Sequence, residues 1–283
     1  SLASFATGLP PSRHGLVGHY LWLPELGQVV NSLKWQTPGG RPVDYDTRPL
    51  LPNPNLWERL AAAGREPITV QPGSFLTTPL TRAIYRGCRF EPAWSEGELV
   101  EATVQLASTP GRLIFTYFPH VDFAAHVFGQ RSQEYRDALV LVALAWERIA
   151  DLLPAGAVMV GTADHGLLDF SEDGKRLIRE PEFDGPVFSG DPRSLMVHGD
   201  TDLVAELAGM LPARAVGSAQ MRNWWGPGPA HPALDARAPA ALLLADDGAL
   251  LLPRGFDKRL VGYHGGLTPQ EVEVPVLVAG ERA

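Results

Sequence analysis

The chain has 283 residues, of which 45% are hydrophobic and 20% are charged. This length supports one large domain or two modest ones, and the composition is that of a packed globular protein rather than a disordered or fibrous one. The formal net charge of −8 argues against a nucleic-acid duplex as the main partner, because a phosphate backbone selects basic surfaces. The single cysteine, Cys88, excludes an internal disulfide framework and multi-thiolate metal sites. Any metal must therefore bind His, Asp or Glu.

Strand-like and helix-like segments alternate along the chain, as is typical of an open α/β sheet. In the first half we expect a helix at 56–63, a strand at 67–71, a helix at about 95–108 that begins with a capping box, a strand at 112–118 and a helix at about 132–153. None of the apolar runs reaches the roughly 20 residues of a membrane span, so no membrane span is expected.

The second half has a different pattern. We expect a strand at 157–162, a helix at about 202–211, a hairpin of 242–244 with 250–252, and a last strand at 272–278 that returns to the main sheet. Residues 167–255 are therefore interpreted as a small inserted α+β subdomain, and residues 1–166 and 256–283 as the core.

Asp122 and His126 are four residues apart just after a predicted buried strand. If this segment is helical, both side chains lie on one face and can bind one ion. The alternative for this pair alone is a helix cap and a solvated histidine. The pair by itself does not decide between these readings.

Two further motifs follow strands or lie in loops. Asp164-His165-Gly166 comes at the carboxyl end of the 157–162 strand, where open α/β sheets bind their ligands, although an ordinary turn has the same composition. His264-Gly265-Gly266 precedes the last strand and could equally be a simple loop. Together with Asp122 and His126, these residues form a carboxylate and imidazole set suited to zinc or manganese. Five ligands are too many for one tetrahedral zinc and too few for two ions, so more carboxylate is required.

The order of these motifs resembles that of a known family. Residues 7–15 (TGLPPSRHG) resemble the T-G-x-x-P-x-x-H-G segment of the nucleotide pyrophosphatase/phosphodiesterase family of the alkaline phosphatase superfamily. The Asp122, Asp164 and His264 motifs follow in that family's order, and the resemblance covers nearly the whole chain. It implies a three-layer αβα sandwich with a mostly parallel central sheet, in which residues 1–166 and 256–283 form the catalytic core.

The resemblance also assigns residues to two divalent metal ions, with zinc expected. By that resemblance, Asp122, His126 and His264 bind one zinc, and Asp164 and His165 bind the second. The family completes the second site with an Asp and a Thr or Ser nucleophile, both of which would lie upstream of Ser1, so the catalytic nucleophile is not assigned within this sequence.

The other histidines have different expected roles. His19 aligns with an Asn that contacts a phosphate oxygen; a histidine could donate a similar hydrogen bond, or it could be a surface residue beside Tyr20. His14 is expected to order the turn before Gly15. The remaining histidines without motif support, His120, His198 and His231, are expected to be solvent-facing or structural.

The expected function is hydrolysis of a small-molecule phosphodiester or nucleotide pyrophosphate through two metal ions and a covalent phosphoenzyme. A diester is favoured because a third carboxylate and an ionised nucleophile would balance the charge of two divalent ions, leaving less attraction for a dianionic monoester. Alternatives are phosphonate or monoester hydrolysis within the superfamily, or a non-catalytic metal- or phosphate-binding homologue if no nucleophile precedes Ser1. The oligomeric state and the compartment do not follow from the sequence.

Overall fold

The computed structural model describes residues 1–52, 54–178 and 186–280. Its internal contacts divide the chain into two compact units. Unit 1 consists of Ser1–Gly8, Thr47–His165 and Glu273–Ala283, and unit 2 consists of Leu9–Asp46 and Gly166–Val272.

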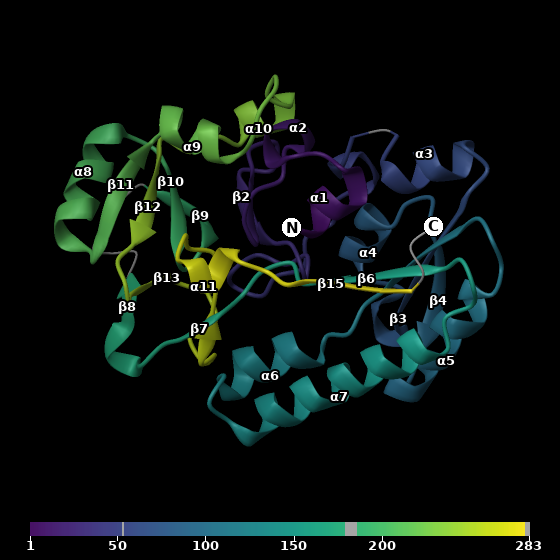
Figure 1. Ribbon diagram of the computed structural model, residues 1–283. Helices are drawn as coiled ribbons and strands as arrows, with labels where there is room; N and C mark the ends of the chain where they lie inside the picture. The colour runs from purple at the N-terminus through teal and green to yellow at the C-terminus, as the bar shows by residue number, and fades with distance from the viewer. Residues whose placement is uncertain (53, 179–185, 281–283) are drawn as a thin grey trace. The chain divides into compact units, whose positions relative to one another are not determined.

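Unit 1 is built on a three-stranded parallel sheet of order β4-β3-β5, of which β3 and β4 are labelled in Figure 1. Its strands are β3 (Glu66–Pro72), β4 (Arg89–Ala93) and β5 (Arg112–Thr116), and a separate antiparallel pair is formed by β6 (Val158–Thr162) and β15 (Val276–Gly280). Its helices are α1 (Leu2–Thr7), α3 (Leu56–Ala62), α4 (Pro79–Ile84), α5 (Glu96–Ala107), α6 (His120–Phe128) and α7 (Gln133–Asp151), with short 3-10 turns at Arg48–Leu50 and Gly73–Phe75.

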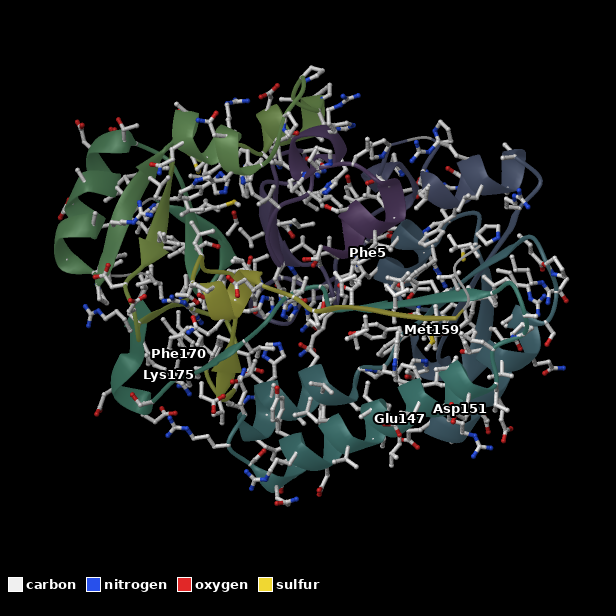
Figure 2. All side chains as sticks on the ribbon, viewed as in Figure 1. Phe5, Glu147, Asp151, Met159, Phe170 and Lys175 are labelled. Atoms are coloured by element: carbon white, nitrogen blue, oxygen red, sulfur yellow. The ribbon has the colours of Figure 1, made fainter. Side chains whose placement is uncertain are left out.

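Helices cover both faces of the parallel sheet because successive strand residues point to opposite sides. Ile114 of β5 packs with Leu99 of α5 in one apolar cluster. The next residue, Phe115, faces the other side, where its ring lies 5.9 Å from Phe5 of α1 and 6.1 Å from Trp57 of α3. Phe5 is labelled in Figure 2. Helix α6 follows β5 directly along the chain, so it begins near the carboxyl end of this strand.

Unit 2 contains a six-stranded antiparallel sheet of order β11-β12-β10-β9-β1-β2. Its strands are β1 (Tyr20–Leu23), β2 (Gln28–Asn31), β9 (Val187–Asp191), β10 (Ser194–His198), β11 (Ala213–Gly217) and β12 (Ala241–Ala245). The smaller pairs are β7 (Leu168–Asp169) with β14 (Gly262–Tyr263), and β8 (Lys175–Ile178) with β13 (Leu250–Pro253). Its helices are α2 (Pro11–His14), α8 (Thr201–Met210), α9 (Ser218–Trp224), α10 (Pro232–Ala236) and α11 (Pro269–Val272).

The predicted α/β class is confirmed, with helices and a parallel sheet in unit 1. The contact-based units do not follow the sequence boundaries, since residues 9–46 and 256–272 belong to unit 2. Strands β1 and β2 join the antiparallel sheet there through the Tyr20–Gly190 bridge. The division into a catalytic core and an inserted subdomain remains a prediction about what the parts do.

Two expected pairings are wrong. Residues 242–244 and 250–252 do not form a hairpin: β12 has both edges occupied by β10 and β11, so β13 pairs in parallel with β8 instead. The segment 272–278 is not one strand, because α11 extends to Val272 and Pro275 precedes β15. Within the described residues, β15 pairs with β6 rather than with the parallel sheet.

The expected capping box at α5 is half formed. Ser95 Oγ accepts the Glu98 amide, but the Glu98 carboxylate accepts the amide of Trp94 instead of that of Ser95. In the described parts of the chain, no helix combines the length and apolar character needed to cross a membrane.

Candidate metal centre

Helix α6 carries the first two predicted ligands. It begins four residues after β5 ends, and it places Asp122 in its first turn and His126 in its last turn. A carboxylate in the first turn is stabilised by the positive end of the helix dipole. The i, i+4 spacing puts both side chains on one face, with His126 Nε2 3.4 Å from Asp122 Oδ1.

The loop after β6 brings two more predicted ligands to the same place. His165 Nε2 lies 3.6 Å from Asp164 Oδ2 and 3.9 Å from Asp122 Oδ1. The ring centroids of His126 and His165 are 6.4 Å apart, and the ring planes are inclined at 64° to each other. Four residues from two distant segments therefore gather in unit 1, and we call them the Asp–His cluster (Asp122, His126, Asp164 and His165).

The spacing of the Asp–His cluster suits metal binding. Ligand atoms bonded to a tetrahedral zinc at about 2.0–2.1 Å lie roughly 3.3–3.4 Å apart, which matches the 3.4 Å between Asp122 and His126. Asp122 Oδ1 is also buried without a hydrogen-bond partner. A buried carboxylate oxygen without a donor is costly unless a cation or proton compensates it.

The Asp–His cluster does not by itself complete a metal site. Among the described residues, no three His, Cys, Asp or Glu side chains form a ready-made metal-binding group. The cluster instead offers two Asp–His pairs, each of which needs further ligands. This agrees with the charge argument that two divalent ions require more carboxylate than Asp122 and Asp164 supply.

The electrostatic surroundings of the cluster are negative. The ion-pair contacts found for Asp122 and Asp164 in the described residues are with histidines rather than with Lys or Arg. Burial, followed by the nearby carboxylates of Asp122 and Asp164, raises the pKa of Tyr117 well above its usual value. The same carboxylates that raise the pKa of this phenol would attract a cation to the cluster.

The first residue of the sequence contacts the same loop. The Ser1 hydroxyl donates a hydrogen bond of 2.6 Å to the backbone carbonyl of Asp164. Helix α1 and the segment that leads into the T-G motif therefore begin beside the Asp–His cluster. Sequence patterns gave no sign of this contact, since it joins residues 163 positions apart.

Two predicted site residues, His19 and His264, belong to unit 2. The His19 ring stacks on Tyr20 with 4.8 Å between centroids, and its backbone amide donates to Asp191 Oδ1 at 3.2 Å. His264 precedes Gly265, whose φ of +106° favours glycine. The predicted roles of both histidines remain predictions.

The remaining histidines have structural contacts. His14 is buried, and its Nδ1 accepts the Leu16 amide at 3.2 Å, as expected for a residue that orders the turn at Gly15. His120 contacts Glu96 at 3.0 Å and His198 contacts Ser189 at 2.7 Å. Similarly, His231 caps α10 by accepting the Ala233 amide.

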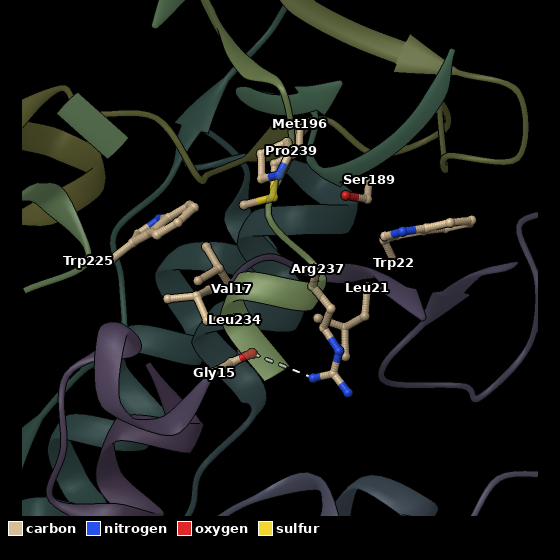
Figure 3. Close-up of a pocket in the computed structure, with 10 residues that line it drawn as sticks. All are labelled: Gly15, Val17, Leu21, Trp22, Ser189, Met196, Trp225, Leu234, Arg237 and Pro239. Atoms are coloured by element: carbon tan, nitrogen blue, oxygen red, sulfur yellow. Dashed lines mark hydrogen bonds between the residues drawn. The ribbon is translucent and has the colours of Figure 1, made fainter. Parts of the chain in front are cut away.

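A small pocket in unit 2 is separate from these residues. Figure 3 shows that it is lined mostly by apolar side chains, together with Ser189 and Arg237, whose Nη1 donates to the Gly15 carbonyl at 3.5 Å. Its volume of about 20 Å³ is enough for one water molecule and too small for a phosphate ester. It contains none of the predicted ligands.

Comparison with known proteins identifies the family. The family described as type I phosphodiesterase / nucleotide pyrophosphatase matches residues 1–208. The chain belongs to this family. It is a hydrolase of the nucleotide pyrophosphatase/phosphodiesterase type, as its motifs predicted. No curated protein sequence matches the chain.

Solved structures share the fold. Murine ectonucleotide pyrophosphatase / phosphodiesterase 5 is 16% identical with a TM-score of 0.69, over 99% of this chain and 76% of that one. Phosphonoacetate hydrolase from Sinorhizobium meliloti, in complex with phosphonoacetate, is 18% identical with a TM-score of 0.67, over 98% of this chain and 77% of that one. An inactive form of the murine protein has been solved in complex with AMP, with 15% identity, a TM-score of 0.69, and coverage of 99% of this chain and 75% of that one. The fold of this type I phosphodiesterase family member is therefore shared with these solved structures.

Proposed function

We propose that the protein hydrolyses phosphodiester or nucleotide pyrophosphate bonds with two divalent metal ions, zinc being the ion expected, through a covalent phosphoenzyme. The observation that carries the proposal is the Asp–His cluster, in which Asp122, His126, Asp164 and His165 meet in unit 1. His264 is proposed as a further ligand from the sequence motif alone.

The metal ions, when bound, would supply positive charge that polarises the phosphoryl oxygens and lowers the pKa of a hydroxyl or water. The chain's own residues have distinct tasks. Asp122 and Asp164 supply negative charge that holds cations, and the neutral imidazoles of His126 and His165 supply nitrogen ligands without adding charge. Tyr117 stays protonated beside them and can act as a hydrogen-bond donor but not as a base.

The Ser1–Asp164 hydrogen bond supports the proposed position of the nucleophile. The family places a Thr or Ser shortly before the T-G motif, and Ser1 already lies against the Asp164 loop. We therefore propose that a Thr or Ser hydroxyl nucleophile acts next to the Asp164 loop.

A diester monoanion is the proposed substrate form. Two carboxylates offset half the charge of two divalent ions, and a further carboxylate with an ionised nucleophile would offset the rest. A second candidate substrate class is the phosphonates, which the structural similarity to phosphonoacetate hydrolase favours. AMP in the murine relative supports a nucleotide substrate instead.

The deciding experiment uses the full encoded protein. Its zinc content is measured, and its hydrolysis of bis-p-nitrophenyl phosphate, p-nitrophenyl phosphate and phosphonoacetate is compared with and without a chelator. Asp164→Ala and His264→Ala serve as ligand variants. We expect metal-dependent turnover that is fastest on the diester and lost in both variants. Equal turnover by wild type and both variants would contradict the metal assignment, and bound zinc without turnover would favour a binding protein.

A further inference from the structure

Arg193 and Glu271 form an ion pair inside unit 2. Arg193 Nε lies 3.1 Å from Glu271 Oε1 and Nη2 lies 3.3 Å from Oε2, with the two side chains 2% and 0% exposed. Such a buried pair is costly to desolvate, and well-packed apolar residues often give equal or greater stability. A planar bidentate pair does, however, fix the positions of the groups around it. The backbone groups that contact Arg193 and Glu271 therefore show which segments the pair holds in place.

Arg193 is locked on its other side by a turn. Its Nη1 donates to the carbonyls of Asp246 and Ala249, each at 2.7 Å, and more weakly to Ala245 at 3.4 Å. The guanidinium lies 5.2 Å from the centre of the Phe170 ring, which is labelled in Figure 2. With both sides held, the guanidinium presents its fork to Glu271 in one orientation.

The carboxylate of Glu271 holds the backbone that follows His264. Oε1 accepts the Gly266 amide at 2.9 Å, and Oε2 accepts the amide and the hydroxyl of Thr268 at 3.4 and 2.9 Å. A Cβ on Gly266 would overlap the Glu271 carboxylate. The glycine is thus required for this contact, and residues 266–268 are fixed by one side chain.

The backbone of Glu271 holds a second segment. Its carbonyl accepts the amide of Gly166, the residue after His165, at 2.9 Å. A Cβ on Gly166 would overlap the carbonyl of Gln270. Glu271 therefore anchors the chain just after His165 with its backbone and the chain just after His264 with its side chain.

The turn that carries Arg193 holds a third segment. Asp191, the last residue of β9 and two residues before Arg193, accepts the His19 amide on Oδ1 at 3.2 Å. A Cβ on Gly265 would lie 2.8 Å from Asp191 Cβ, so the backbone beside His264 packs against the same side chain.

We propose that the Arg193–Glu271 pair, with the β9–β10 turn, is the positioning device of the hydrolytic site. It fixes the backbone next to His264 and His19 in unit 2, so that these two side chains are oriented before a metal or substrate binds, and it also holds Gly166. Arg193 and Glu271 are positioning residues, since they act through the backbone of the segments they hold. This inference rests on the proposed function.

The test compares Glu271→Gln, which keeps the shape but removes the charge, with the double variant Arg193→Met/Glu271→Leu, which replaces the pair by apolar side chains. The control is Asp235→Asn, which breaks the exposed ion pair of Arg222 and Asp235 in the same unit. Each protein is assayed for thermal unfolding, for amide hydrogen exchange in residues 264–268, and for the zinc concentration that gives half-maximal diester hydrolysis.

We expect faster exchange at 264–268 and an increase of about 10-fold or more in the zinc requirement for both pair variants, the size typical of residues that orient metal ligands. The double variant should show both changes even if its unfolding temperature equals that of wild type. Asp235→Asn should show neither. A folded double variant with wild-type exchange and a wild-type zinc requirement would overturn the proposal.

Combining Glu271→Gln with His264→Ala distinguishes an effect of Glu271 on the position of His264 from a general loss of structure. If Glu271 acts through His264, the combined variant should bind zinc no more weakly than His264→Ala alone. The same further loss in both backgrounds would overturn a role through His264. If wild type shows no metal-dependent hydrolysis, the proposed function fails, and unchanged exchange at 264–268 in Glu271→Gln would then also refute the anchoring.

Discussion

Asp122 Oδ1 and His126 Nε2 lie 3.4 Å apart on one face of α6. Both residues belong to the helix that follows β5, and the Asp122 oxygen is buried without a hydrogen-bond partner. A helix of nine residues thus holds a carboxylate and an imidazole at the separation of two zinc ligands before any ion is present. The arrangement has a measurable consequence for stability.

Zinc should stabilise the wild-type protein and not an Asp122→Asn variant. A ligand that binds only the folded state at 100 times its Kd adds about 2.7 kcal/mol to the free energy of unfolding. Asparagine keeps the shape of Asp122 but lacks the charge, so we expect it to weaken zinc binding at least about 100-fold. This loss exceeds the effect that is typical when a residue that only hydrogen-bonds to a metal ligand is replaced. Thermal unfolding with and without zinc measures the difference.

The matched control is Asp137→Asn on α7, an exposed carboxylate that accepts a hydrogen bond from Gln133. It should keep the full zinc-dependent increase in unfolding temperature. An equal zinc response in wild type and Asp122→Asn would show that Asp122 does not bind the ion.

The metal-free protein should lose stability in mild acid. Burial lowers the pKa of His14 and of His198 to about 4, from 6.5 in the unfolded chain. Between these values the unfolded chain binds more protons, so stability is complete above pH 6.5 and falls as the pH decreases toward 4. Each histidine contributes at most about 3 kcal/mol to this loss.

Replacing His198 by Gln, which can still bond to Ser189, should reduce the slope of stability against pH by up to one proton in this range. Urea unfolding midpoints at several pH values give the slope. A variant as acid-sensitive as wild type would show that His198 is not buried in its neutral form.

Local patterns in the sequence predicted the position of each half of the Asp–His cluster, whereas the meeting of the two halves was implied by the family resemblance. The i, i+4 spacing of Asp122 and His126, and the position of Asp164-His165 after a buried strand, both follow from element geometry. Pairings between segments that are distant in the sequence could not be predicted from local patterns. The wrong hairpin at 242–252 had good local turn chemistry, but β10 and β11 occupy both edges of β12. The Arg193–Glu271 pair joins residues 78 positions apart and has no local signal.

Helix α3 should depend on its N-cap. Asn55 is fully buried, its side chain accepts the Glu58 amide at 2.8 Å, and its own backbone amide donates to the Glu58 carboxylate at 2.9 Å. Asn55 Nδ2 also donates to the Arg86 carbonyl. Asn55→Ala should therefore cost about 2 kcal/mol, the upper end of capping effects. Urea unfolding measures this, with Ser95→Ala as the comparison.

Ser95 forms a single cap bond at α5 and is exposed, so its loss should cost about 0.5–1 kcal/mol. A smaller effect at Asn55 than at Ser95 would contradict the view that burial and the second hydrogen bond add to the cap.

Gly265 and Gly248 provide a matched pair in unit 2 for separating backbone strain from contact. Both have positive φ, +106° and +76°, but a Cβ at Gly248 would meet nothing within 4 Å, whereas one at Gly265 would lie 2.8 Å from Asp191 Cβ. Gly248→Ala should cost about 1–2 kcal/mol of unfolding free energy, the penalty of a left-handed residue, and leave hydrolysis unchanged. Gly265→Ala should cost more and should displace the backbone next to His264, lowering diester hydrolysis at least about 10-fold. Unfolding and turnover of both variants decide the matter: an active Gly265→Ala enzyme would mean that close packing against Asp191 is not needed at the site.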